Sequence, residues 1–430
     1  MIKYNYKDSN FSTDIEKLYN RPSYPAEIED TVKEVLLDIK NNGNEALIKY
    51  AKKFDSLDLT SETIKVSDAE LKDAISKVDV KAKQAIKRAL KNVESFSKER
   101  IPQPWSFSPR PGVILGERFE PMERIGVYIP GGTAPLVSSV IHTAGIAKAA
   151  GVKEIVAVTP ANPDTDIHPA VLYAMKQAGV TEIYRLGGIY GIGAMAYGTG
   201  TIQKVEKIVG PGNAYVTAAK KLVYGEVAID MIAGPSEIMV IADESSPAEF
   251  IAADLLSQAE HGSGLEQAVV VCDSAEVLNE VEVEVKKQAE LLSRSETIDK
   301  VMNNGMFLIQ VESMDQAAEI ASKYAPEHLE IMCKSPGKVA KKVKAAGAIF
   351  IGKWTPEPVG DFTAGPSHVL PTAGSGKFFS GLTVEGFFRR MSILNYQKYA
   401  LKDELGDIMK FAELEGLDAH GRSAEIRIKK

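Results

Sequence analysis

A glutamate and a histidine lie side by side in the segment Ala-Pro-Glu-His-Leu, as Glu327 and His328. Such groups suit proton transfer near neutral pH, because histidine titrates in that range and burial can raise the pKa of a glutamate toward it. A proline followed by an acidic residue is also typical of a helix start, where the carboxylate meets the positive end of the helix dipole. The pair is therefore a candidate for acid–base catalysis, with a helix start as the alternative interpretation.

Other segments carry side chains that could bind a cation. Gln258 and His261 are three residues apart at the predicted end of a helix, so both side chains project from one face. Asp361 lies in a long segment rich in Gly and Pro, and His420 follows Glu415 by five residues near the carboxyl terminus. Taken alone, Gln258 and His261 are better explained by a helix end bonded to its own loop, and a histidine placed like His420 is often only solvated surface.

Apolar periodicity predicts the elements that position these residues. Residues 26–54 and a segment beginning at Ser67 have helical spacing, and Ser67 with Glu70 forms a capping-box pattern. From residue 125 onward, helical segments alternate with nine runs rich in Val and Ile, namely IGVYI, EIVAVTP, EIYRL, KIVGPG, AIDMIA, EIMVIAD, AVVVC, MFLIQV and AIFIG. This alternation predicts an α/β protein with parallel sheets. Residues 355–381 are predicted to form a loop, and the tail after residue 382 is predicted to be helical.

Composition excludes several classes of protein. The chain has 430 residues, 44% of them hydrophobic, and a formal net charge of −7, so disorder and nucleic-acid binding are both disfavoured. Cys272 and Cys333 lie in apolar runs, which favours reduced thiols and a cytoplasmic location. The uncharged stretch from Ile125 to Ala147 is broken by Gly and Pro, so no membrane span is predicted.

The spacing of Gly191, Gly193 and Ala196 after the run EIYRL fits a dinucleotide-binding turn. Such a turn aims helix amides at a pyrophosphate, but no acidic residue follows at the distance that would hold a ribose. Close packing of two helices through small residues explains the same spacing.

Seven segments, read together and in order, resemble the histidinol dehydrogenase family. They cover most of the chain from Arg124 to His420. The segments are YIPGG, KIVGPGNAYVT, IDMIAGPSE, DLLSQAEHG, YAPEHL, GDFTAGPSHVLPT and EGLDAH.

The resemblance implies two incomplete Rossmann-like domains with parallel sheets, amino-terminal helices and a carboxyl-terminal tail that is swapped between the subunits of a homodimer. We therefore expect an amino-terminal segment at residues 1–26 and a second Rossmann-like domain at 128–237. The first, discontinuous Rossmann-like domain is expected at residues 27–127 and 238–380, and the inter-subunit tail at 381–430.

The resemblance also implies an activity and a set of site residues. The activity is the NAD-dependent and zinc-dependent oxidation of L-histidinol to L-histidine through histidinal, the last two steps of histidine biosynthesis. The implied zinc ligands, one ion per subunit, are Gln258, His261, Asp361 and His420. Ser236, His328 and Glu415 complete the substrate site, and Glu415 and His420 come from the partner subunit in the family.

By the same resemblance, His328 takes the alcohol proton and Glu327 activates the water that adds to the aldehyde. Tyr128, Asn213 and Tyr190 match cofactor positions, although the family usually has glutamine where this chain has Tyr190. Because of that departure, oxidation of another alcohol such as sulfopropanediol remains an alternative activity. A metal-dependent hydrolase and an inactive metal-binding protein are the alternatives from other classes.

Overall fold

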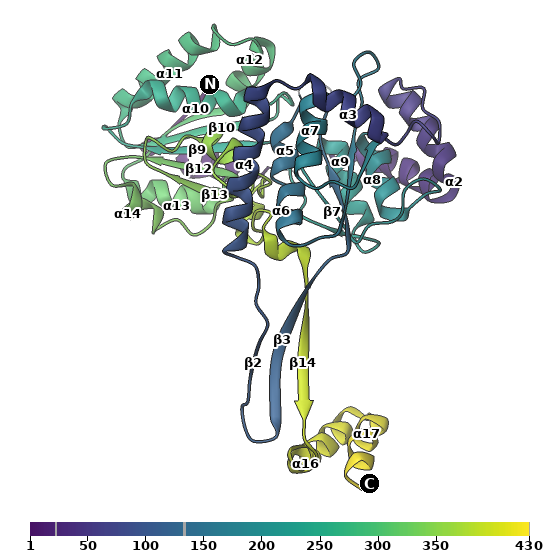
Figure 1. Cartoon of the computed structure of the whole chain (residues 1–430). Helices are drawn as coiled ribbons and strands as arrows, with labels where there is room; N and C mark the ends of the chain where they lie inside the picture. Colours follow the sequence, from purple (N-terminus) through teal and green to yellow (C-terminus); the bar gives the residue numbers. More distant parts are fainter. Residues whose placement is uncertain (22–23, 132–134, 430) are drawn as a thin grey trace.

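The structure is a computed structural model that describes residues 1–21, 24–131 and 135–429. Two α/β bodies lie side by side, and an antiparallel arm extends away from them to a pair of helices at the carboxyl terminus (Figure 1). The predicted α/β fold class with parallel sheets is confirmed, and all nine apolar runs predicted as strands contain one.

The first body contains a six-stranded parallel sheet in the order β1-β11-β10-β9-β12-β13. Its strands are β1 (Ile2–Asn5), β9 (Glu237–Ala242), β10 (Gln267–Cys272), β11 (Met306–Gln310), β12 (His328–Met332) and β13 (Ala348–Ile351). Successive residues of β9 point to opposite faces: Ile238 and Val240 face one apolar core, and Met239 and Ile241 face the other. Both faces are covered, which explains why the strands read as continuous apolar runs.

Helices form the two covering layers of this sheet. The first core includes α10 (Ala248–Ala259), α11 (Ala275–Ala289) and α12 (Ser295–Asn304). The second includes α1 (Phe11–Tyr19), α13 (Met314–Tyr324) and α14 (Pro336–Ala340). The helix predicted to end at His261 stops at Ala259, so His261 lies just beyond it.

The second body contains a five-stranded parallel sheet in the order β6-β5-β4-β7-β8. Its strands are β4 (Arg124–Tyr128), β5 (Glu154–Thr159), β6 (Glu182–Arg185), β7 (Lys207–Val209) and β8 (Ala228–Ile229). Its own helices are α5 (Val137–Ile141), α6 (Ala144–Ala149), α7 (Pro169–Gln177), α8 (Gly188–Tyr197) and α9 (Ala214–Val223). The chain proceeds outward from β4 in one direction and then in the other, so the strand order reverses between β4 and β7. In sheets of this kind, ligands bind at the carboxyl ends of the strands at such a reversal.

The amino-terminal helices pack on the second body. They are η1 (Ala26–Ile28), α2 (Glu29–Asp55), α3 (Asp68–Lys77) and α4 (Val80–Lys98), and the buried side chains of α2, α3 and α4 belong to the same core as β4 and β5. This packing differs from the predicted division, which grouped residues 27–127 with the first sheet. The predicted capping box is confirmed: Ser67 accepts from the Glu70 amide while the Glu70 carboxylate accepts from the Ser67 amide.

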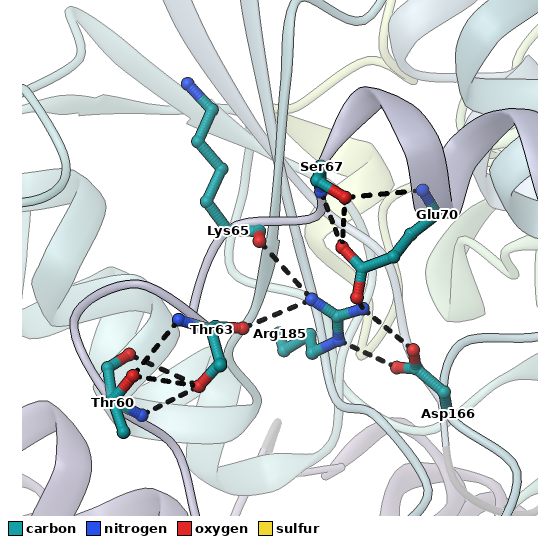
Figure 2. Close-up of polar contacts among 7 residues, drawn as sticks. All are labelled: Thr60, Thr63, Lys65, Ser67, Glu70, Asp166 and Arg185. Carbon is teal, nitrogen blue, oxygen red and sulfur yellow. Dashed lines mark hydrogen bonds and ion pairs between the residues drawn. The ribbon is translucent and has the colours of Figure 1, made fainter.

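Arg185 joins the α2–α3 connection to the second sheet, and Figure 2 shows its guanidinium at the centre of that junction. It donates to the carboxylates of Glu70 and Asp166 at 2.7 and 2.8 Å and to the carbonyls of Thr63 and Lys65. Because every direction of the planar guanidinium fork has an acceptor, the junction is fixed in orientation as well as position.

The arm corrects the prediction that the tail is helical throughout. β14 (Phe388–Tyr396) pairs antiparallel with β3 (Val113–Pro121), which also pairs with β2 (Trp105–Phe107). Helices α16 (Lys398–Glu415) and α17 (Asp418–Lys429) follow the arm, far from both bodies in Figure 1. The strand was missed because its partner lies over 250 residues earlier in the chain, and pairing rather than local propensity decides its conformation.

Within the part of the chain that the structure describes, no helix combines the length and the apolar character needed to cross a membrane. Cys272 and Cys333 are both free thiols, as predicted.

Candidate active site and metal centre

The paired acid and imidazole lie at the amino end of β12, beside the start of the adjacent strand β9. His328 is the first residue of β12 and is in register with Ile238 of β9. Both Glu327 and His328 are buried, with 7% and 3% of their surfaces exposed. The structure therefore places the pair at a strand start, and the alternative interpretation of a helix start is wrong.

Hydrogen bonds fix the orientation of both side chains. The amide of Glu237 donates to Oε2 of Glu327 at 2.9 Å, and its carbonyl lies 3.0 Å from Nδ1 of His328. Since a carbonyl can only accept, Nδ1 carries a proton, and Nε2 is the ring nitrogen left to face the site. Nε2 lies 3.4 Å from Oδ1 of Asp361. The imidazole thus presents Nε2 toward the predicted metal ligand.

Burial and neighbouring charges perturb the pKa values of both groups. Removal from water raises the pKa of Glu327 to about 8. Burial by itself lowers the pKa of His328, but the nearby carboxylates of Glu327 and Asp361 outweigh it and raise that pKa to about 10. At these pKa values both groups carry a proton at neutral pH. A cation bound at Asp361 would lower the pKa of His328 and so let it accept a proton.

Three side chains bring potential metal-binding atoms together. Ligand atoms of His261, Glu357 and Asp361 lie within 4.8 Å of one another, and the Gln258 side chain is in the last turn of α10 beside His261. Both amide atoms of Gln258 and Oδ1 of Asp361 are buried with no hydrogen-bond partner among the described residues. Since buried polar groups are rarely left unpaired, these atoms fit the demand of a cation for nitrogen and oxygen donors.

Glu357 is a site residue that the sequence analysis missed. It opens α15 (Glu357–Phe362) inside the predicted loop, one helical turn before Asp361, and burial raises its pKa to about 8. Its carboxylate accepts from Ser257 on α10 at 3.1 Å, so it connects the helix of Gln258 to the helix of Asp361. The four-residue spacing of Glu357 and Asp361 was the available signal, but no helix was expected there.

Ser236 and the loop after α15 complete the surroundings of this centre. Oγ of Ser236 lies 3.3 Å from Nδ1 of His261. The loop, which contains η2 (Ser375–Lys377) and η3 (Val384–Phe387), crosses to the second body, where Ser367 donates to the His142 carbonyl. The rings of His142 and His368 stack with their centroids 4.6 Å apart, so the loop connects the two bodies beside the site.

The three predicted cofactor residues lie in the second body but not all on one surface. Tyr128 ends β4, and its hydroxyl accepts from the amide of Gly188; Asn213 caps α9 after β7. Both therefore lie near the reversal of strand order. Tyr190 is fully buried in α8 and donates to the carboxylate of Asp55 at the end of α2, so here it joins two helices.

Gly210 follows β7 and lets its backbone pass close to Tyr128 at the end of β4. A Cβ at this position would lie 2.2 Å from the carbonyl oxygen of Tyr128, and its φ of +121° favours glycine.

Glu415 and His420 are not near the other predicted site residues of the same chain. Glu415 ends α16 and His420 is in α17, both solvent-exposed at the far end of the arm (Figure 1). A single chain therefore assembles Ser236, His261, His328 and Asp361, with Gln258 on the adjoining helix turn, and leaves the tail residues out.

Comparisons with known proteins identify this arrangement. The family model described as histidinol dehydrogenase matches residues 20–428. Histidinol dehydrogenase of Heliobacterium mobile is 44% identical over 406 residues, covering 94% of this chain and 95% of the relative. The relative of the same name from Clostridium acetobutylicum is 45% identical over 404 residues, covering 94% and 93%. The crystal structure of histidinol dehydrogenase from Elizabethkingia anophelis has a TM-score of 0.94 at 37% identity and covers 100% of this chain and 98% of its own. The chain is an oxidoreductase and belongs to the histidinol dehydrogenase family.

Proposed function

We propose that this protein catalyses the NAD-dependent, zinc-dependent oxidation of L-histidinol to L-histidine through bound histidinal, the last two steps of histidine biosynthesis. The observation that carries the proposal is Nε2 of His328 directed at Asp361, 3.4 Å away, with the Glu327 carboxylate alongside. This juxtaposition puts a proton acceptor at the edge of a cation site.

The residues divide the chemistry between them. His328 would accept the hydroxyl proton as the alcohol is oxidised to the aldehyde, and bound NAD would supply the hydride acceptor. Glu327 would then take a proton from the water that adds to the aldehyde while His328 returns its proton to the aldehyde oxygen. His328 would thereby be able to accept a hydroxyl proton of the resulting hydrate when a second NAD takes the second hydride. Retaining the aldehyde in the site protects it from other nucleophiles.

Gln258, His261 and Asp361 would hold zinc, and the buried Glu357 is close enough to support or replace one of them. When bound, zinc would hold the amine and imidazole of the substrate rather than activate water. A cation bound at Asp361 would also offset one of the charges that raise the pKa of His328, which favours the neutral form of the imidazole.

The fourth ligand, His420, and the substrate ligand Glu415 are proposed to come from a partner subunit. The tail exposes large apolar side chains, with Leu394, Phe411 and Leu414 each more than 60% exposed. Apolar surface of this extent on an extended arm favours burial against another copy of the chain.

The cofactor is proposed to bind at the strand reversal of the second sheet, against Tyr128 and Asn213. Tyr190 would act there indirectly, through its buried contact with Asp55 and the position of α8.

The test is NADH formation by the purified, zinc-loaded protein with L-histidinol, with sulfopropanediol and other primary alcohols in parallel. We expect about two NADH per histidinol consumed, because each substrate loses two hydrides. Hydrolysis of an ester or amide without any NADH would instead support a metal-dependent hydrolase, and NADH formation with another alcohol alone would change the substrate.

A further inference from the structure

One backbone unit, that of Glu237, holds both members of the acid–base pair. Its amide donates to the Glu327 carboxylate at 2.9 Å and its carbonyl accepts from Nδ1 of His328 at 3.0 Å. The preceding residue, Ser236, contacts His261 at 3.3 Å. The start of β9 therefore sets the relative positions of the base, the acid and one metal ligand.

The side chain of Glu237 is itself held by a buried ion pair. Arg21 donates to both carboxylate oxygens, from Nε at 2.7 Å and from Nη2 at 3.2 Å, and the amide of Ala373 donates to Oε1 at 3.0 Å. Only 5% of the Arg21 side chain and 4% of the Glu237 side chain are exposed. A two-pronged contact of this kind fixes direction as well as distance.

Arg21 is held in turn by the segment that leads to the acid–base pair. Nη2 donates to the carbonyl of Tyr324 at 2.9 Å, and the guanidinium lies 3.5 Å from the centre of the Tyr324 ring. The hydroxyl of Tyr324 donates to Gln267 at 2.7 Å. The guanidinium thus connects Glu237, at the start of β9, with Tyr324, in the segment just before Glu327. These are the two segments whose hydrogen bonds orient the acid–base pair.

Stability alone is a weak explanation for such a pair. Burying two charges costs desolvation energy that their attraction often only balances, and apolar residues of similar volume can serve stability as well. An ion pair that fixes the orientation of a functional backbone unit has a role that apolar residues could not fill.

We propose that Arg21 and Glu237 are positioning residues for the acid–base pair. The ion pair sets the rotation of the Glu237 backbone and thereby holds Glu327 and His328 in place for both oxidation steps. Neither residue is assigned a contact with substrate or cofactor. The inference rests on the proposed function.

The experiment compares Glu237→Gln, Arg21→Met and Arg21→Lys with the wild type, using zinc-loaded enzyme, saturating NAD and L-histidinol. Rates are expressed per folded, zinc-containing subunit. We expect Glu237→Gln and Arg21→Met to lower kcat about 10- to 100-fold, because misplacement of about an ångström has effects of this size. KM for histidinol should stay within about threefold, because ground-state binding is unchanged. Arg21→Lys keeps the charge but loses the fork and should fall between.

Arg124→Met is the matched control. Arg124 is also a buried arginine, 9% exposed, which donates to Glu154 at 2.6 Å and Glu182 at 3.0 Å at the start of β4. Its loss should lower Tm while leaving kcat per folded subunit unchanged.

Wild-type kcat in both Glu237→Gln and Arg21→Met, or a fall in kcat of the same size in Arg124→Met, would overturn the inference and leave the proposed function standing. If Arg21→Met does not fold, Glu237→Gln and Arg21→Lys decide, because each nearly preserves the volume of the residue it replaces. A wild-type enzyme that forms no NADH from histidinol would overturn the proposed function and this inference together.

Discussion

Nε2 of His328 lies 3.4 Å from Oδ1 of Asp361, although the two residues belong to different elements, β12 and α15. The contact places the proposed proton acceptor beside the proposed cation. The two ring nitrogens of His328 therefore have different partners: Nε2 faces Asp361, and Nδ1 donates to the Glu237 carbonyl.

The two members of the acid–base pair should affect the two oxidation steps differently. His328→Asn should lower kcat for both steps about 100-fold or more, because a general base acts in each. Glu327→Gln should lower oxidation of added histidinal about 10-fold more than formation of histidinal, because only the aldehyde step needs an activated water. Stopped-flow measurement of NADH with each substrate checks this, and equal losses in both steps would refute the separate role of Glu327.

Removal of the metal should abolish activity reversibly. Treatment with a chelator should release about one zinc per subunit, and stoichiometric zinc should restore the rate. Asp361→Asn should lower bound zinc and activity together, since it removes a charged ligand. The control Asp30→Asn changes an exposed carboxylate on α2 and should alter neither. Full zinc content in Asp361→Asn, measured by atomic absorption, would remove Asp361 from the ligand set.

Mixed dimers test whether the tail completes the partner's site. His328→Asn and His420→Ala chains should each be inactive alone. In a mixed dimer, the body of the His420→Ala chain meets an intact tail, so one of the two sites is whole. Co-expression with two different affinity tags should therefore yield mixed dimers with about half the wild-type kcat per dimer, if the sites act independently. Absence of activity in purified mixed dimers would show that the tail serves its own chain.

Acid should weaken the attachment of the amino-terminal strand. Hydrogen bonds from Lys286 and Lys3 lower the pKa of Glu282 from 4.5 to about 2, and Lys3 belongs to β1. Because the folded-state pKa is depressed, this stabilisation is present above pH 4.5 and is lost as the pH falls toward 2. The contact is partly exposed, so its effect should be about 1 kcal/mol at most.

The corresponding variant is Glu282→Gln. It should lower Tm at neutral pH, and the difference from the wild type should shrink as the pH falls below 4.5. Thermal scans across that range check the prediction. A difference independent of pH would mean that Glu282 contributes through packing rather than charge.

The sequence by itself determined the elements whose partners are local or whose burial is complete on both faces. Apolar runs identified every strand of the second sheet and most of the first, because a strand covered by helices on both sides must be apolar along its length. Ser67 and Glu70 predicted the start of their helix correctly, because a capping box forms within one helical turn. The adjacency of Glu327 and His328, and the three-residue spacing of Gln258 and His261, were likewise local facts.

Only the tertiary structure decided which elements meet. Periodicity reports that a helix has an apolar face but not which core buries it, so α2, α3 and α4 could not be assigned to the second body in advance. β14 became a strand because β3 was available to pair with it. Arg21 and Glu237 are 216 residues apart, and no local pattern marks either for the other. Contacts of this range arise when the sheets are assembled, and they turn a list of chemically able side chains into a site.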